Sequence, residues 1–349
     1  MLLGVLSIKA WITGRMTVPQ NMSRRELFRY SGLGIGLLAA GAEGLEHASA
    51  SESERTLAKS IPIVDTHQHL WDFRKFRPPW LKSEPKLNHS TTIADYYRAA
   101  AGLNIINTIY MEVGVALRQQ LQEAEWVIDV CRKHNTPMAA GVVSCRPALP
   151  GFETYARRFK SNPYVKGMRQ VLQVPEAPKG LCVSPRFVEN MNLLGELGLS
   201  FDICIRPGEL SDGIQLADLC PDTRFILDHC GNAAARNPHQ AQWEEDIAEF
   251  GKRKNVVCKI SGVIKTVKPE WNAGKELEHI VHHCIKSFGT DRVMFGGDWP
   301  VCNNTSSLRG WVETLQWIVR DMPEEDKRKL FAGNAIRFYA LKPDNTHKG

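Results

Sequence analysis

The chain has 349 residues, of which 43% are hydrophobic and 23% are charged, and its formal net charge is +6. These values are ordinary for a soluble globular protein, and the chain is long enough for one large domain. The positive charge is mild and scattered without a basic block, so the composition argues against a nucleic-acid partner.

The first fifty residues have the features of an export signal. Two consecutive arginines lie within residues 23–29, followed by a short apolar stretch at 33–42 and a small-residue cleavage site at 48–50. The apolar stretch is shorter than the roughly 20 residues of a membrane span. We therefore expect a twin-arginine signal over 1–50 and a periplasmic or extracellular mature protein without stable membrane insertion. A fortuitous basic, amphipathic end is the alternative, and translation can also start at Met22.

Cysteine usage bears on the redox state of the exported protein. The chain has nine cysteines, an odd number, and no two of them have Cys-x-x-Cys spacing. Most lie within apolar runs, which favours small, buried, reduced core residues. Reduced cysteines are compatible with a twin-arginine signal because passengers of that pathway fold before export.

After a short linker at 51–60, short apolar runs alternate with helical stretches. The runs expected to form strands are 61–66, 107–113, 138–144, 164–170, 200–206, 224–230, 255–261 and 291–297. Apolar residues three and four apart predict helices between them, over 121–135, 185–197, 243–253, 275–288 and 308–320, with a terminal helix at 324–339. Eight such strand–helix units predict an α/β fold, a single-domain (β/α)8 TIM barrel over 61–345, with a long loop at 73–90.

In such barrels the functional site lies at the C-terminal ends of the strands. The polar residues at these ends are His67, His69, Glu112, Arg169, Gln170, Cys204, Arg206, Asp228, His229, Ser261 and Asp298. From this placement we expect Gln170 and Arg206 to contact the substrate, and Trp71, which follows the first motif, to form a wall of the pocket.

The histidines of the first strand are the strongest candidates. His67 and His69 are two residues apart, so in a strand their side chains point to the same side. A pair of hydrogen-bonded core histidines is the structural alternative. At the end of the sixth strand, His229 is the candidate, and its neighbour Asp228 is the alternative inward-facing residue.

Four motifs in this order resemble the amidohydrolase superfamily, and within it the lactonase branch of sugar-lactone and 2-pyrone-4,6-dicarboxylate hydrolases. They are Asp-Thr-His67-Gln-His69-Leu-Trp-Asp, Lys-Gly-Met-Arg169, Leu-Asp-His229-Cys-Gly and Phe-Gly-Gly-Asp298-Trp-Pro. The resemblance covers roughly residues 60–340. It implies a barrel that hydrolyses a cyclic ester, with Asp298 activating water as general base and the three histidines polarising the carbonyl. Arg169 would bind a substrate carboxylate or hydroxyl, with an ion pair to Glu112 as the alternative.

The wider superfamily holds one or two divalent metals on the His-x-His pair, a strand-four lysine, histidines on strands five and six, and the strand-eight aspartate. This chain has no histidine in its fifth strand, and Lys166 lies three residues before Arg169. A binuclear site is therefore not expected, and we expect either no cofactor or a single divalent metal, zinc by its donor set. Its ligands would be His67, His69 and Asp298, with Cys204 replacing the missing histidine or, alternatively, packing as a small core residue.

Opening a lactone needs a nucleophilic water, an electrophile for the developing oxyanion and a proton for the leaving alkoxide. Asp298 suits the first task if desolvation raises its pKa. Imidazole N–H groups, or a metal that they hold, suit the second. We expect a lactone hydrolase acting on a sugar-derived or carboxylated small molecule, since basic residues in the loops indicate an anionic ligand.

Two other functions stay open at this stage. The first is a metal-dependent amidohydrolase or decarboxylase of the same superfamily. A zinc decarboxylase would be expected to keep a histidine on strand five, which this chain lacks. A barrel kept for binding alone is the second, and the retained histidines and Asp298 argue against it.

Overall fold

The computed structural model describes residues 60–133, 135–237 and 239–342. The predicted signal at 1–50 and all of the predicted linker except Ser60 lie outside the described residues. Among the described residues, no helix combines the length and the apolar character that crossing a membrane requires.

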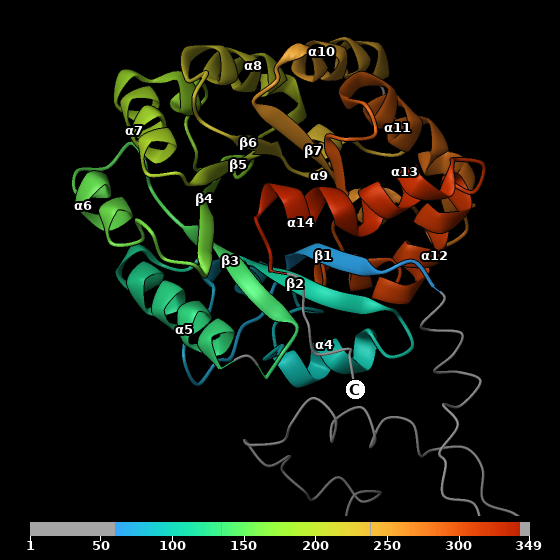
Figure 1. Cartoon of the computed structure of the whole chain (residues 1–349), viewed down its shortest axis with the longest axis horizontal. Helices are drawn as coiled ribbons and strands as arrows, with labels where there is room; N and C mark the ends of the chain where they lie inside the picture. Colours follow the sequence, from blue (N-terminus) through green and yellow to red (C-terminus); the bar gives the residue numbers. More distant parts are fainter. Residues whose placement is uncertain (1–59, 134, 238, 343–349) are drawn as a thin grey trace, which may run out of the picture. The chain divides into compact units, whose positions relative to one another are not determined.

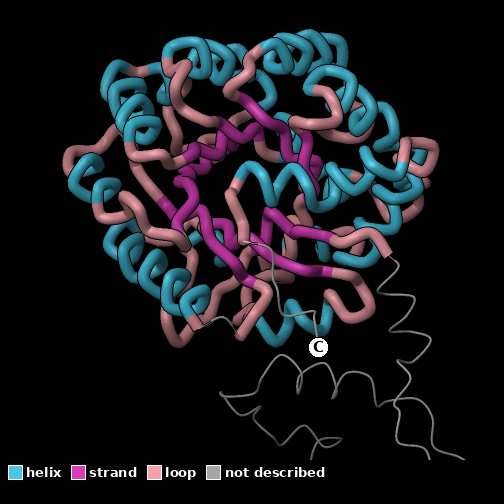
Figure 2. Tube along the Cα trace, in the orientation of Figure 1, coloured by secondary structure: helices cyan, strands magenta, loops and turns pink. Residues whose placement is uncertain are grey.

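Eight parallel strands form one sheet in which each strand pairs with the next along the chain. They are β1 (Ile63–Gln68), β2 (Ile105–Met111), β3 (Met138–Ser144), β4 (Val165–Val171), β5 (Ser200–Cys204), β6 (Phe225–Leu227), β7 (Val256–Ile260) and β8 (Val293–Phe295). A parallel bridge between Gln68 and Trp299 connects the two edges, so the sheet is nearly closed. Figures 1 and 2 show the strands surrounded by helices. This arrangement fits the predicted (β/α)8 TIM barrel, and every predicted strand is present.

Most of the helices form an outer layer around the sheet (Figure 2). The helices, in chain order, are α4 (Ile93–Ala99), α5 (Gln120–Arg132), α6 (Phe152–Arg157), α7 (Pro185–Glu196), α8 (Leu210–Leu219), α9 (His229–Asn232), α10 (Gln240–Lys252), α11 (Ala273–Phe288), α12 (Leu308–Ile318), α13 (Glu324–Arg328) and α14 (Asn334–Phe338). The predicted terminal helix is interrupted by a π-helical segment at Lys329–Gly333. The predicted loop at 73–90 contains a 3-10 helix, η1 (Pro79–Ser83).

Apolar side chains form two buried cores. The larger lies between the sheet and the outer helices. The smaller lies inside the barrel, where Val64, Ile109 and Met294 pack with Ala335 and Tyr339 from the end of the chain. Figure 1 shows α14 lying across the opening of the barrel. Because α14 closes the end of the barrel at which the strands begin, a functional site can form only at the C-terminal ends of the strands.

Asp65 joins the first and last strands. Its carboxylate accepts hydrogen bonds from the backbone N–H of Gly297 at 2.7 Å and of His67 at 3.0 Å, and from the Tyr96 hydroxyl of α4 at 2.8 Å. A Cβ atom at Gly297 would lie 2.5 Å from the Asp65 carboxylate, so this close approach requires glycine. Asp65 thus links the two motifs that contain His67 and Asp298.

The register of β1 shifts between Asp65 and Gln68. Asp65 contacts the outer helix α4, whereas His67 points into the barrel, although strict alternation would put both on one face. A bulge of one residue reverses the alternation and so explains the inward direction of His67.

Candidate active site

Three side chains from distant parts of the chain converge at the C-terminal ends of the strands. One ligand-type atom each of His67, His229 and Asp298 lies within 4.8 Å of the other two. The ring centroid of His67 lies 4.9 Å from that of His69 and 4.5 Å from that of His229. The structure therefore brings together the four residues that the sequence nominated for chemistry, and their catalytic roles stay predictions.

His69 has two acceptors as neighbours. Its Nδ1 lies 3.1 Å from the carbonyl oxygen of Met111, so this nitrogen carries the hydrogen. The other nitrogen, Nε2, lies 3.4 Å from Oδ1 of Asp298. In a neutral ring Nε2 has a lone pair that faces the carboxylate, and a proton or a bound cation between the two atoms would resolve this contact.

His67 is held by two charged neighbours. Nη1 of Arg169 donates to its Nε2 at 3.2 Å, and its Nδ1 lies 3.5 Å from Oδ1 of Asp228. Burial lowers the pKa of His67 well below its usual value despite the nearby Asp228 carboxylate. The ring is therefore neutral at neutral pH, with a proton on Nδ1 toward Asp228.

His229 follows β6 in a left-handed backbone conformation, with φ of 55°. Because regular strand geometry ends here, both Asp228 and His229 reach the site, although the sequence presented them as alternatives. Nδ1 of His229 lies 2.9 Å from Oγ of Ser261, and burial lowers the pKa of His229 to about 4. A Cβ atom at Gly262 would lie 2.4 Å from that same Nδ1, so only glycine leaves room for the ring.

The electrostatics of Asp298 differ from expectation. Burial raises the pKa of its carboxyl, but the electrostatic effects of the neighbouring His229, Lys265 and His69 outweigh burial. The pKa lies well below its usual range, and the carboxylate stays ionised. The expectation that desolvation would raise this pKa is therefore wrong, because the surrounding cationic and hydrogen-bonding groups stabilise the anion.

Arg169 is part of a buried chain of charges inside the barrel. Its Nε donates to Oε1 of Glu112 at 2.8 Å, and its Nη1 donates to Oδ2 of Asp228 at 3.1 Å. Asp228 also faces the ammonium of Lys259 at 3.4 Å, and Lys259 pairs with Asp202 at 2.5 Å. The ion pair between Arg169 and Glu112 is thus present, and a substrate-binding role for Arg169 stays a prediction.

The other predicted substrate contacts are Arg206, Gln170 and Trp71. Arg206 pairs with Glu209 and donates to the carbonyl oxygen of Val174, which anchors the loop after β4. The side-chain oxygen of Gln170 is buried without a hydrogen-bond partner among the described residues. Trp71 is fully buried in the outer core. Its ring packs among core side chains, and a place in the pocket wall stays a prediction.

Sequence reasoning missed three charged residues near the site. The ammonium of Lys265, in the 3-10 helix η5 (Val263–Thr266), lies 3.8 Å from Oδ2 of Asp298, and its side chain is 30% exposed. Lys259 and Asp202 are fully buried between β7 and β5. An isolated lysine within an apolar strand was the one available signal for Lys259.

The residues present fit a single divalent cation. His67, His229 and Asp298 offer two imidazoles and a carboxylate, a donor set that suits zinc, and Oδ2 of Asp298 is buried without a hydrogen-bond partner among the described residues. Nε2 of His67 would have to exchange its hydrogen bond from Arg169 for the metal. The Cys204 sulfur lies within 4.8 Å of ligand atoms of Asp228 and His229, a set that shares only His229 with the first. Burial raises the pKa of Cys204 to about 12, so a metal would have to displace its proton.

Comparison with known proteins agrees with these motifs and this fold. The family model described as Amidohydrolase matches residues 64–341. The chain belongs to the amidohydrolase family. It is 24% identical to an L-fucono-1,5-lactonase of Burkholderia multivorans over 80% of this chain and 96% of that one. Family membership identifies the chain as a hydrolase.

Solved structures of the family share the fold. An amidohydrolase from Burkholderia multivorans with bound zinc has a TM-score of 0.72 and 20% sequence identity, with 80% of this chain and 100% of that chain covered. A probable 2-pyrone-4,6-dicarboxylic acid hydrolase from Acinetobacter baumannii with citric acid bound has a TM-score of 0.66 and 12% identity, with 80% and 100% covered. At these identities the likeness supports the barrel architecture.

Proposed function

We propose that this amidohydrolase opens a lactone of a sugar-derived or carboxylated small molecule by attack of water on the ring carbonyl. The observation that carries the proposal is an ionised carboxylate, Asp298, surrounded by three imidazoles and the partly exposed Lys265 at one end of the barrel. The lactonase and the 2-pyrone-4,6-dicarboxylic acid hydrolase among the similar proteins support a cyclic ester as substrate.

Each side chain has a role that follows from its position. Asp298 orients the attacking water and accepts its proton, since its Oδ2 has no other hydrogen-bond partner among the described residues. His229, and His69 once its Nε2 has taken up a proton, lie beside the same carboxylate and stabilise the developing oxyanion. Lys265 can pair with a substrate carboxylate, because its ammonium is partly exposed beside Asp298.

His67 depends on the charges behind it. Arg169 and Asp228 contact its two ring nitrogens, so they fix its orientation and its tautomer. A single zinc ion held by His67, His229 and Asp298, with His69 beside it, would supply Lewis-acid polarisation of the carbonyl.

A metal-dependent amidohydrolase or decarboxylase reaction is the second candidate. The contact of 3.4 Å between Nε2 of His69 and Oδ1 of Asp298 favours it, because two acceptors face each other where a cation would fit. The fifth strand argues for the lactonase, since it offers Cys204 and no histidine.

The deciding experiment uses purified mature protein without the predicted signal. Metal content is measured first, and a panel of neutral and carboxylated lactones is then assayed with and without a chelator. We expect lactone hydrolysis that is lost in D298N. Stoichiometric zinc with chelator-sensitive activity would refute the metal-free mechanism. Release of carbon dioxide from aromatic acids without hydrolysis of any lactone would overturn the proposal in favour of a decarboxylase.

A further inference from the structure

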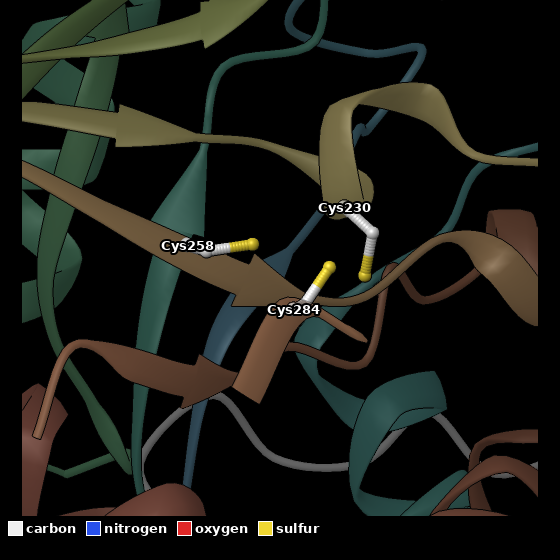
Figure 3. A group of neighbouring side chains, drawn as sticks. All are labelled: Cys230, Cys258 and Cys284. Atoms are coloured by element: carbon white, nitrogen blue, oxygen red, sulfur yellow. The ribbon is translucent and has the colours of Figure 1, made fainter. Parts of the chain in front are cut away.

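Three of the nine cysteines meet directly behind the candidate active site. Cys230 lies in the turn after β6, Cys258 in β7 and Cys284 in α11, and their sulfur atoms all lie within 4.8 Å of one another. All three are fully buried and unpaired. Figure 3 shows the three thiols turned toward one another, each from a different element.

The spacing of these sulfur atoms suits a metal ion. Bonds of about 2.3 Å from a central metal to each sulfur place the sulfur atoms of a trigonal site roughly 4 Å apart. The hydrogen bonds that the cluster makes to the protein are weak, since Cys230 and Cys258 reach the carbonyl oxygen of Lys259 at 3.7 and 3.8 Å through sulfur. A soft cation would therefore replace little existing bonding.

We propose that Cys230, Cys258 and Cys284 form a second metal site, which binds one soft, thiophilic cation such as Cu(I) or Cd(II). On binding, sulfur–metal bonds replace the S–H bonds, and the released protons pass to solvent. Soft thiolate ligands select such cations over hard ones, so magnesium or calcium would not compete.

This site couples to the active site through the backbone. Cys230 directly follows His229, and both residues have left-handed φ angles, of 54° and 55°. Movement of the Cys230 sulfur toward a metal displaces this turn and with it the His229 ring. A bound soft cation therefore inhibits turnover, an effect that rests on the proposed function.

The binding test uses reduced mature protein, one equivalent of Cd(II) and X-ray absorption at the cadmium edge. We expect a first shell of three sulfur ligands, lost in C284A and kept in C131A, a variant of a buried cysteine in α5 that lies outside the cluster. A shell of nitrogen and oxygen alone would place the ion on the histidine site and overturn the proposal. The wild-type spectrum decides this even if C284A does not fold.

The inhibition test compares lactone hydrolysis with and without Cd(II) after chelation of weakly bound metal. We expect at least a tenfold loss of turnover in wild type and in C131A, and no loss in C284A, which keeps its basal activity. Equal inhibition of C284A would overturn the coupling to His229. If no lactone is hydrolysed, the proposed function fails, whereas the sulfur coordination still decides the metal site.

Discussion

Asp298 is the residue on which the proposed chemistry depends most. Its carboxylate is buried and ionised, and it faces His67 at 3.9 Å and His69 at 3.4 Å. We expect D298N to lower kcat/KM for a lactone by about 10²–10⁴-fold, because the amide cannot accept the proton of the attacking water. Steady-state kinetics measure the loss, and D222N, at an exposed position, is the matched control. Full activity of a folded D298N would refute the base role.

Lys265 gives a separate test of substrate class. If its ammonium pairs with a substrate carboxylate, K265M raises KM for carboxylated lactones by about 10-fold or more, in line with the loss of a charge-assisted hydrogen bond. Neutral lactones should be affected much less. K268M, which removes an exposed lysine three residues on, controls for net charge. Equal losses for both substrate classes would contradict the specificity role.

The candidate catalytic residues could be predicted from the sequence because of their positions at strand ends. His67, His69, His229 and Asp298 each follow an apolar run, and parallel strands bring such ends together. The ion pair between Lys259 and Asp202 could not be predicted from the sequence, because it forms only when two distant strands place both side chains inside the barrel. Lys265 follows β7 in a short 3-10 helix that carries no periodic signal.

At the scale of elements, simple strand alternation does not explain by itself why His67 points into the barrel. The pairing of His67 with His69 agrees with the expectation, yet the bulge after Asp65 is what turns His67 inward. The helices α4, α6 and α8 were not predicted, and α6, with six residues, is too short for an apolar period to show. The helices α7, α11 and α12 were predicted within two residues at each end, whereas α5 and α10 each differ by three residues at one end.

Glu123 in helix α5 should make the free energy of unfolding depend on pH. This buried carboxyl accepts hydrogen bonds from the Tyr110 hydroxyl and the Val113 N–H, and burial together with Glu112 raises its pKa from 4.5 to about 8. Because the pKa of Glu123 is higher in the folded state than in the unfolded state, Glu123 contributes fully to the free energy of unfolding below pH 4.5. This contribution is lost as the pH rises toward 8.

We therefore expect the free energy of unfolding of wild type to fall between pH 5 and pH 8 relative to E123Q. Each pKa unit corresponds to about 1.4 kcal/mol, so the difference is on the order of a few kcal/mol. Urea unfolding at both pH values measures it, with E125Q on the exposed face of α5 as control. A parallel dependence in wild type and E123Q would exclude Glu123 as the source.

At the scale of the whole molecule, we propose that the chain leaves the cytoplasm by the twin-arginine route. The conservative pair R24K/R25K keeps the charge but removes the arginine pattern that the pathway reads. Cell fractionation should then find the protein retained in the cytoplasm, in contrast to R15K, which lies before the motif. Export of the double variant at the wild-type level would rule out this route.

The helix α14 has a consequence for how the barrel keeps water out. Ala335 and Tyr339 complete the core inside the barrel, where they pack with Val64, Ile109 and Met294. Removing the residues from 334 on would open this interior to solvent at the end where the strands begin. Because all eight strands border that interior, such a truncation would weaken the whole sheet, including the strand ends that position the site.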